Sequence, residues 1–280
     1  MFLLSCLSLS GCFSSQQLIN EQAVNLFKAM SLAANRQSDV VLVRQGIPSY
    51  LLLIDGMIQS NPDNSDLLLA AAQAYGSYAS LSGEEEERAA QLIKRAKVYA
   101  LMALDQHPKF RGILNKPIDL FHQQIKDADK DLAPFLFGVG SIWGTWIAQG
   151  PDSLEGMADL PKVEIIMDRV LELQPEIYYG GPHLFKAILL SARPVQYGGN
   201  LNKAEFHFKQ AMKYSNKKFL LTRVYFAQYY ARQRLDKELF ISTLNQVMET
   251  PNDIEPDMTL ANTLAREKAK KLLEQADEFF

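Results

Sequence analysis

Apolar residues recur at helical spacing along almost the whole chain after Leu18. Runs in which Val, Ile or Thr alternate with polar residues, the pattern typical of strands, are scarce. Between Leu67 and Ala79 the apolar positions are three or four residues apart, which places them on one broad face of a helix. The pattern therefore predicts an all-α fold.

The apolar face between Leu67 and Ala79 consists largely of small side chains. Small side chains allow a second helix to approach closely, as in repeats that are built from paired helices. The tetratricopeptide repeat has such a first helix, then a second helix with Ala, Phe and Ala, and a proline at its exit. Four pairs of segments fit this pattern in degenerate form: residues 67–79 with 96–108, 135–147 with 163–175, 184–191 with 204–211, and 224–231 with 240–247.

These repeats predict a single helical domain over residues 12–280. Units of this kind cannot bury their apolar faces alone, so about four of them are expected to stack into a tetratricopeptide-like solenoid of helical hairpins. Residues 17–35 and 48–60 are expected to form an N-terminal pair of capping helices, and residues 258–280 a long C-terminal capping helix. Prolines at positions 62, 151 and 251 mark breaks between helices.

The N-terminus has features of a secreted lipoprotein. The first residues, MFLLSCLSLSGC, are apolar and uncharged like a signal-peptide core, although no cationic segment precedes them. Leu9-Ser10-Gly11-Cys12 has the form of a lipobox, so residues 1–11 are interpreted as the remnant of a signal peptide and Cys12 as the lipidated residue. The alternative is an ordinary buried cysteine in a first helix. Phe13 stands where an acidic residue would retain an enterobacterial lipoprotein in the inner membrane, which favours the outer membrane.

Charge and hydropathy restrict the remaining possibilities. The formal net charge is −3, and Lys and Arg are spread along the chain, so nucleic-acid binding is not expected. A membrane-spanning helix needs roughly 20 apolar residues. No run after Cys12 is expected to reach this length, and the longest candidate, residues 135–148, contains three glycines.

The chain lacks the motifs of the common enzyme classes. Its four histidines, at positions 107, 122, 183 and 207, have no metal-ligand spacing, and no nucleophile elbow, P-loop or dinucleotide fingerprint is present. We therefore expect no cofactor, no metal and no enzymatic activity. The alternative is a hydrolase that uses His183 with a nearby acid. Glu84–Glu87 and the cations Lys268, Lys270 and Lys271 are interpreted as solvated charges that complement helix dipoles.

Two glycine-bearing stretches are candidates for binding. Residues 178–183 (YYGGPH) open one predicted helix, and residues 193–200 (RPVQYGGN) turn from that helix into the next. Glycine allows positive φ and close backbone approach, and exposed Tyr, His and Arg side chains commonly bind ligands. A third such loop is expected at residues 38–48. The candidate ligand- or partner-binding residues are Arg44, Tyr178, Tyr179, His183, Arg193 and Tyr197. The alternative is that these stretches are only structural corners.

Several of these stretches resemble one protein family. Residues 46–56, 67–79, 178–184, 193–194 with 198–199, and 203–204 resemble the T component of tripartite ATP-independent periplasmic (TRAP) transporters, a group of helical lipoproteins with cryptic tetratricopeptide repeats. The resemblance implies a lipid-anchored periplasmic protein that can form a homotrimer and encloses a channel through each protomer. It also implies a partner, the substrate-binding P component of the transporter.

The leading hypothesis is therefore an accessory module of substrate uptake, which docks the P component and holds or passes a small organic or hydrophobic ligand. The alternative is a general scaffold of the outer-membrane assembly type, which would recognise extended peptides in the concave face of the solenoid.

Overall fold

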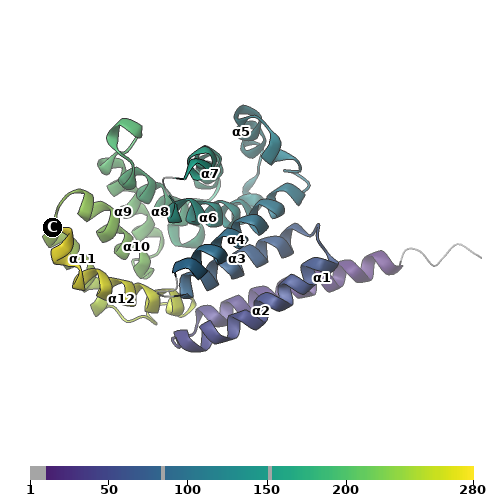
Figure 1. Cartoon of the computed structure of the whole chain (residues 1–280), viewed down its shortest axis with the longest axis horizontal. Helices are drawn as coiled ribbons and strands as arrows, with labels where there is room; N and C mark the ends of the chain where they lie inside the picture. The colour runs from purple at the N-terminus through teal and green to yellow at the C-terminus, as the bar shows by residue number, and fades with distance from the viewer. Residues whose placement is uncertain (1–10, 83–85, 151–152) are drawn as a thin grey trace, which may run out of the picture.

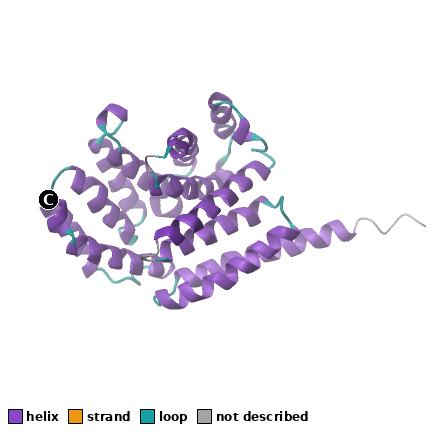
Figure 2. Cartoon of the chain, in the orientation of Figure 1, coloured by secondary structure: helices purple, strands orange, loops and turns teal. Residues whose placement is uncertain are grey.

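The computed structural model describes residues 11–82, 86–150 and 153–280, without the side chains of residues 11–21 and 23. Throughout these residues the chain forms helices, turns and loops, and they include no strand (Figure 2). The predicted all-α fold is confirmed. Cys12 lies in the first turn of the first helix, and its side chain, like residues 1–10 of the predicted signal peptide, is outside the described part of the chain.

The helices follow one another with short connections. The α-helices are α1 (Gly11–Asn35), α2 (Val40–Ser60), α3 (Ser65–Leu81), α4 (Glu86–Gln106), α5 (Ile118–Lys126), α6 (Ala133–Gln149), α7 (Leu154–Leu173), α8 (Ile177–Ala192), α9 (Leu201–Tyr214), α10 (Leu220–Tyr225), α11 (Lys237–Glu249), α12 (Thr259–Glu274) and α13 (Ala276–Phe279). Short 3₁₀ segments occur at η1 (Ile113–Asn115), η2 (Lys130–Leu132), η3 (Val195–Tyr197) and η5 (Pro256–Met258). A π-helix, η4 (Phe226–Ala231), continues α10.

Neighbouring helices pack in pairs. The pairs α3 with α4, α6 with α7, α8 with α9, and α10 and η4 with α11 contain the four pairs of segments proposed as repeats. Alanines account for the close approach of α3 and α4, since Ala71, Ala72, Ala96 and Ala100 have no exposed surface. The assignment of these pairs to a tetratricopeptide solenoid stays a prediction.

One expected loop proved to be helical. Residues 38–48 were expected to form a loop around Arg44 and Gly46, but α2 begins at Val40 and includes Pro48. Asp39 caps this helix, because its carboxylate accepts a hydrogen bond of 2.9 Å from the backbone N–H of Leu42. This cap stabilises a helix that begins at Val40, before Gly46 and Pro48, which are both unfavourable inside a helix.

The sequence analysis missed an insertion between α4 and α6. Residues 113–132 form η1, α5 and η2, which belong to no predicted repeat. Phe121 and Ile125 of α5 are buried, and α5 packs against α7. At the other end of the chain, the expected single capping helix is divided into α12 and α13 at Gln275.

The arrangement of the helices is an arc whose ends meet. In Figure 1 the last helices, drawn in yellow, return toward α1 and α2, drawn in purple. Helix α12 contacts both α1 and α2, and Leu260 packs with Val40, Val43 and Leu81 in one apolar cluster. The two ends of the chain therefore form a common wall.

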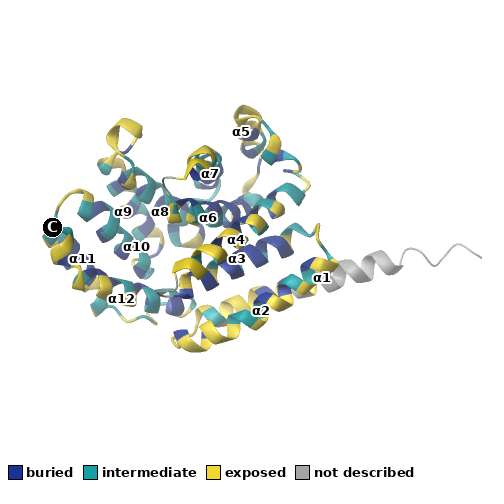
Figure 3. Cartoon of the chain, viewed as in Figure 1, coloured by how far each residue is buried: buried dark blue, intermediate teal, exposed yellow. Residues whose placement is uncertain are grey.

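Helix α2 combines a buried side with an exposed apolar side. Its buried residues are Val40, Val43, Leu51, Ile54 and Ile58. Its outer face is exposed (Figure 3) and carries four large apolar side chains, Val41, Leu42, Leu52 and Leu53. This helix of 21 residues is long and apolar enough to cross a membrane by length and composition. The expectation that no later run reaches this length was therefore wrong, because α2 extends through the expected loop.

Candidate functional site

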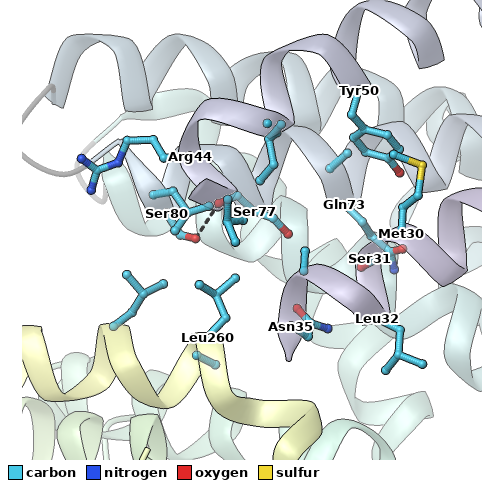
Figure 4. Close-up of a pocket in the computed structure, with 18 of the residues that line it drawn as sticks. Met30, Ser31, Leu32, Asn35, Arg44, Tyr50, Gln73, Ser77, Ser80 and Leu260 are labelled. Carbon is cyan, nitrogen blue, oxygen red and sulfur yellow. Dashed lines mark hydrogen bonds between the residues drawn. The ribbon is translucent and has the colours of Figure 1, made fainter. Parts of the chain in front are cut away.

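A pocket of about 960 Å³ lies where the two ends of the arc meet. Its walls come from α1, α2 and α3 on one side and from α10 and α12 on the other, and Tyr178 at the start of α8 also lines it. In Figure 4, Leu260 of α12 faces side chains of α1, α2 and α3 across the open space. Pockets that hold small molecules usually measure about 300 to 1,000 Å³, so this one has the size of a ligand site.

Small and neutral polar side chains of α3 form one wall. Ala70, Gln73, Ala74, Ser77 and Ser80 line the pocket at helical spacing. The Ser80 hydroxyl donates to the Ser77 carbonyl oxygen at 2.7 Å, as the dashed line in Figure 4 shows. This bond keeps Ser80 on its own helix, and the amide of Gln73 provides both a donor and an acceptor at the wall.

Large apolar side chains make up most of the remaining surface. They are Phe27, Met30, Leu32, Ile47, Tyr50, Leu81, Leu221, Leu260 and Leu264. The rings of Phe27 and Tyr50 meet edge to face, with centroids 5.1 Å apart. Burial raises the pKa of Tyr50 to about 12, so its phenol stays neutral at physiological pH. The interior is therefore suited to an apolar group.

Cations outnumber carboxylates at the pocket. Lys28, Arg44, Lys268 and Lys271 line it, together with Glu267. The Lys268 ammonium lies 4.7 Å from the ring centroid of Tyr225. Lys268 was interpreted from the sequence as a solvated, dipole-complementing charge. In the structure it is half-buried against the pocket, and burial lowers its pKa.

An unusual backbone conformation places Tyr178 at the pocket. Tyr178, Tyr179 and Gly180 have φ angles of 46°, 62° and 80° and form a left-handed turn. Residues other than glycine lose roughly 1 to 2 kcal/mol each in this region. Strain of this kind is common at functional sites. The Tyr178 ring stacks on Phe137 with centroids 5.0 Å apart, which helps to hold the turn.

Glycine is required in this turn for reasons of space. A Cβ atom at Gly180 would lie 2.8 Å from the Cα atom of Ala211 in α9, and a Cβ atom at Gly181 would lie 2.4 Å from the Phe137 ring. The close approach that the sequence suggested for this stretch is therefore present. Tyr179 contributes to packing instead of lining the pocket, because its ring packs against the Phe219 ring, with 5.6 Å between the ring centroids.

His183 is buried between α8 and α9. Its Nδ1 atom lies 2.8 Å from Nδ1 of His207, and its ring stacks on Tyr214 with centroids 5.6 Å apart. Burial, followed by the charge of His207, lowers the pKa of His183 to about 4. The ring is therefore neutral at physiological pH. This position accounts for His183 by packing and does not place it at the pocket.

Arg193 and Tyr197 lie at the opposite end of α8 from Tyr178. Arg193 pairs with Glu164 of α7, with 3.2 Å between Nη1 and Oε2. The backbone of Gly199 lies against the carbonyl oxygen of Arg193, where a Cβ atom would not fit. Tyr197 is 73% exposed. Tyr178 and Arg193 are roughly 20 Å apart along a helix that rises about 1.5 Å per residue. The two glycine-bearing stretches therefore do not line one opening.

Of the six candidates, the pocket brings together Arg44 and Tyr178. Sequence reasoning missed the residues of α1, α3 and α12 that complete it. One signal for α12 was available, because Leu260, Leu264, Lys268 and Lys271 follow one another at helical spacing. Within the described residues, no group of three His, Cys, Asp or Glu side chains could hold a metal ion.

The fold and the pocket define an all-helical protein whose first and last helices enclose a space for a small molecule. A family model for the TRAP transporter T-component (TAtT) matches residues 36–280, which include α2 to α13. The chain therefore belongs to the TRAP transporter T-component family, as the sequence resemblance predicted. This is a family of transporter accessory proteins and not of enzymes. A comparison with curated proteins finds no match.

Proposed function

We propose that this protein is a periplasmic, lipid-anchored accessory component of a TRAP transporter that docks the P component and holds or passes a small organic or hydrophobic ligand. The observation that carries the proposal is the pocket between the two ends of the arc, in a chain of the T-component family. The pocket has the volume and the mainly apolar lining of a ligand site. Its polar and charged groups come from α1, α2, α3 and α12.

The strained turn at Tyr178 supports a binding role for the pocket. Two tyrosines adopt left-handed backbone angles at the same place where one of them reaches the pocket. Packing alone would be satisfied at lower cost by a glycine or an asparagine in such a turn. The position of Tyr178 at the pocket gives a functional reason for this conformation.

The corner between α8 and α9 is the proposed contact with the P component. Val195 and Tyr197 are 82% and 73% exposed, and they project from η3 next to Arg193. Aromatic residues and Arg are enriched at the centres of protein interfaces. The corner is separate from the pocket, so a docked partner would leave the pocket lining unchanged.

The lipid anchor is proposed at Cys12. Helix α1 begins at Gly11 and leads from this cysteine to the wall of the pocket at Phe27. A diacylglycerol group on Cys12 would hold the protein at a membrane surface, and the sequence after it favours the outer membrane. The homotrimer that the sequence resemblance implies stays a prediction.

Co-elution tests the proposed docking. The Cys12→Ser protein and the TRAP P component of the same organism should elute together in size-exclusion chromatography at micromolar concentration. Tyr197→Ala should weaken the complex, whereas Leu154→Ala, at an apolar side chain that is 86% exposed elsewhere, should not. Separate elution of the two wild-type proteins would contradict docking. Capture of outer-membrane peptides instead would favour the scaffold alternative.

A further inference from the structure

The charges around the pocket are unbalanced. Among the described residues, its lining contains the cations Lys28, Arg44, Lys268 and Lys271 but a single carboxylate, Glu267. Lys28, Arg44 and Lys268 come from three different helices, α1, α2 and α12, and line the same space. This excess of cations among the described lining residues favours an anion over a cation in the pocket.

Lys268 differs from the other three cations because it is half-buried, whereas they are exposed, and its ammonium lies over the Tyr225 ring. In the part of the chain that the structure describes, no carboxylate forms an ion pair with its ammonium group. Several other partly buried or buried cations have carboxylate partners: Lys97 pairs with Asp159, Lys186 with Asp168, and Arg193 with Glu164. Others donate to backbone carbonyls, as Lys162 does to Leu114 and Arg223 does to Lys217. A buried charge without a partner is costly, and an anion in the pocket would offset that cost.

The walls on either side of Lys268 are apolar. Leu264 and Leu221 lie beside it on α12 and α10, and Phe27, Met30 and Leu32 line the opposite side on α1. Burial raises the pKa of Tyr225 to about 12, so the phenol below Lys268 stays neutral and does not neutralise the ammonium. A ligand that satisfied both features would combine one anionic group with an apolar chain.

We propose that the pocket binds an anionic amphiphile, with Lys268 pairing with its charged headgroup and the apolar walls of α1, α2 and α10 covering its chain. This inference rests on the proposed function, since it names the class of ligand that the pocket holds. Lys28 and Arg44 are exposed at the rim, where they attract the anion but contribute less to its binding than the half-buried Lys268 does.

Calorimetric titration with dodecanoate tests this ligand class. Dodecanoate should bind the Cys12→Ser protein, and Lys268→Met should weaken binding about tenfold, because a charge-assisted hydrogen bond is lost. Lys268→Arg should restore it. Lys270→Met removes an exposed cation of α12 that does not line the pocket, so it should bind dodecanoate like the parent protein.

Two further probes separate the headgroup from the chain. Dodecanol has the same chain without the charge and should bind the parent and Lys268→Met proteins equally. Butanoate has the same headgroup with a short chain and should bind at least about a hundredfold more weakly than dodecanoate. Equal binding of dodecanol and dodecanoate to the parent, or of butanoate and dodecanoate, would overturn the proposal. So would an unchanged affinity of Lys268→Met or no binding of dodecanoate at all.

The source of the amphiphile is tested with vesicles of phosphatidylglycerol. If Lys268 binds a free amphiphile, vesicle flotation of the Cys12→Ser protein should not change with Lys268→Met. Flotation that depends on Lys268 would show that the headgroup belongs to a bilayer lipid, and would overturn the pocket as its site.

Thermal melting without ligand checks that Lys268→Met folds. Co-elution with the P component is a separate measurement, so loss of dodecanoate binding with intact co-elution overturns this inference alone.

Discussion

The Nε atom of Arg36, one residue after α1, donates a hydrogen bond of 2.7 Å to Oδ1 of Asp257 in η5. This ion pair joins two residues that are 221 positions apart in the sequence. It lies beside the apolar cluster of Val40, Val43, Leu81 and Leu260, where the ends of the arc meet. A polar and an apolar contact therefore close the arc together.

The ion pair should contribute little to stability. The side chains of Arg36 and Asp257 are 55% and 40% exposed, and exposed pairs contribute about 0.2 to 1 kcal/mol. A double-mutant cycle with Arg36→Ala and Asp257→Ala, measured by urea denaturation, should give a coupling in this range that decreases with salt. Leu260→Ala should cost more, about 2 to 5 kcal/mol, because it removes apolar packing. The reverse order would mean that closure is electrostatic.

Tyr178→Gly should separate binding from stability. The change loses the stacking on Phe137, which is worth about 0.5 to 1.5 kcal/mol, but it relieves a left-handed residue by a similar amount. We expect a free energy of unfolding within about 1 kcal/mol of wild type. Binding of dodecanoate should weaken, because Tyr178 lines the pocket. Tyr197→Gly, at the far end of α8, should leave this binding unchanged.

His183 should make the protein less stable in acid. Its pKa is lowered to about 4 in the folded chain from 6.5, so the unfolded chain binds more protons in this interval. The contribution of neutral His183 is therefore present above about pH 6.5 and is lost as the pH falls toward about 4. The charged groups nearest the pair are Lys186 and Lys203, which oppose protonation of His207, and Asp168, which favours it.

The test is the change in melting temperature between about pH 7 and about pH 5. His183→Gln should reduce this change relative to wild type, since a neutral amide replaces the titrating ring. His122→Gln, at an exposed histidine of α5, serves as the control and should show the wild-type change. An equal pH dependence in wild type and His183→Gln would contradict the assignment to His183.

Two glycine substitutions should have opposite effects. A Cβ atom at Gly199 would lie 1.9 Å from the carbonyl oxygen of Arg193, a backbone atom that has little freedom to move. Gly199→Ala should therefore destabilise the protein by about 1 to 3 kcal/mol. Gly46 is inside α2, and a Cβ atom there would meet no other atom within 4 Å, so Gly46→Ala should stabilise by about 0.5 to 1 kcal/mol. Urea denaturation measures both.

Cys12→Ser should release the protein from membranes. A diacylglycerol group on Cys12 is the proposed anchor, and two acyl chains give stable membrane attachment whereas a serine cannot carry them. Fractionation of cells that express each form behind a complete signal peptide measures the effect. The helical circular dichroism spectrum should be the same for both forms. A mutant that stays in washed membranes would point to the exposed apolar face of α2 as the anchor.

The helices and their pairing were largely predictable because short stretches of sequence determine them. The alanines of α3 and α4 mark the faces that pack, and the prolines at 62 and 251 mark where helices end. The start of α2 was not predictable in this way, since Gly46 and Pro48 are typical of loops. The cap at Asp39 and the packing of Val40 and Val43 against Leu260 outweigh these local preferences.

The pocket was less predictable because it joins distant parts of the sequence. Arg44 and Tyr178 were identified as candidates from nearby glycines, but the reason for their position is the closure of the arc. The sequence around Lys268 is like that of a solvated helix end, and its position over the Tyr225 ring at the pocket comes only from the tertiary fold. His183 and Arg193 have the residue types of a binding site, yet they pair with His207 and Glu164.

The closure of the arc has a consequence for synthesis of the chain. One wall of the pocket is made by residues 27–81, whereas the other is made by residues 221–271. At the usual rate of translation, the roughly 140 residues between the two walls take about 7 to 30 s to be added. Throughout that time the apolar side chains of the first wall, including Phe27 and Tyr50, have no cover from α12. A growing chain therefore leaves this apolar wall of the pocket uncovered until α12 has been made.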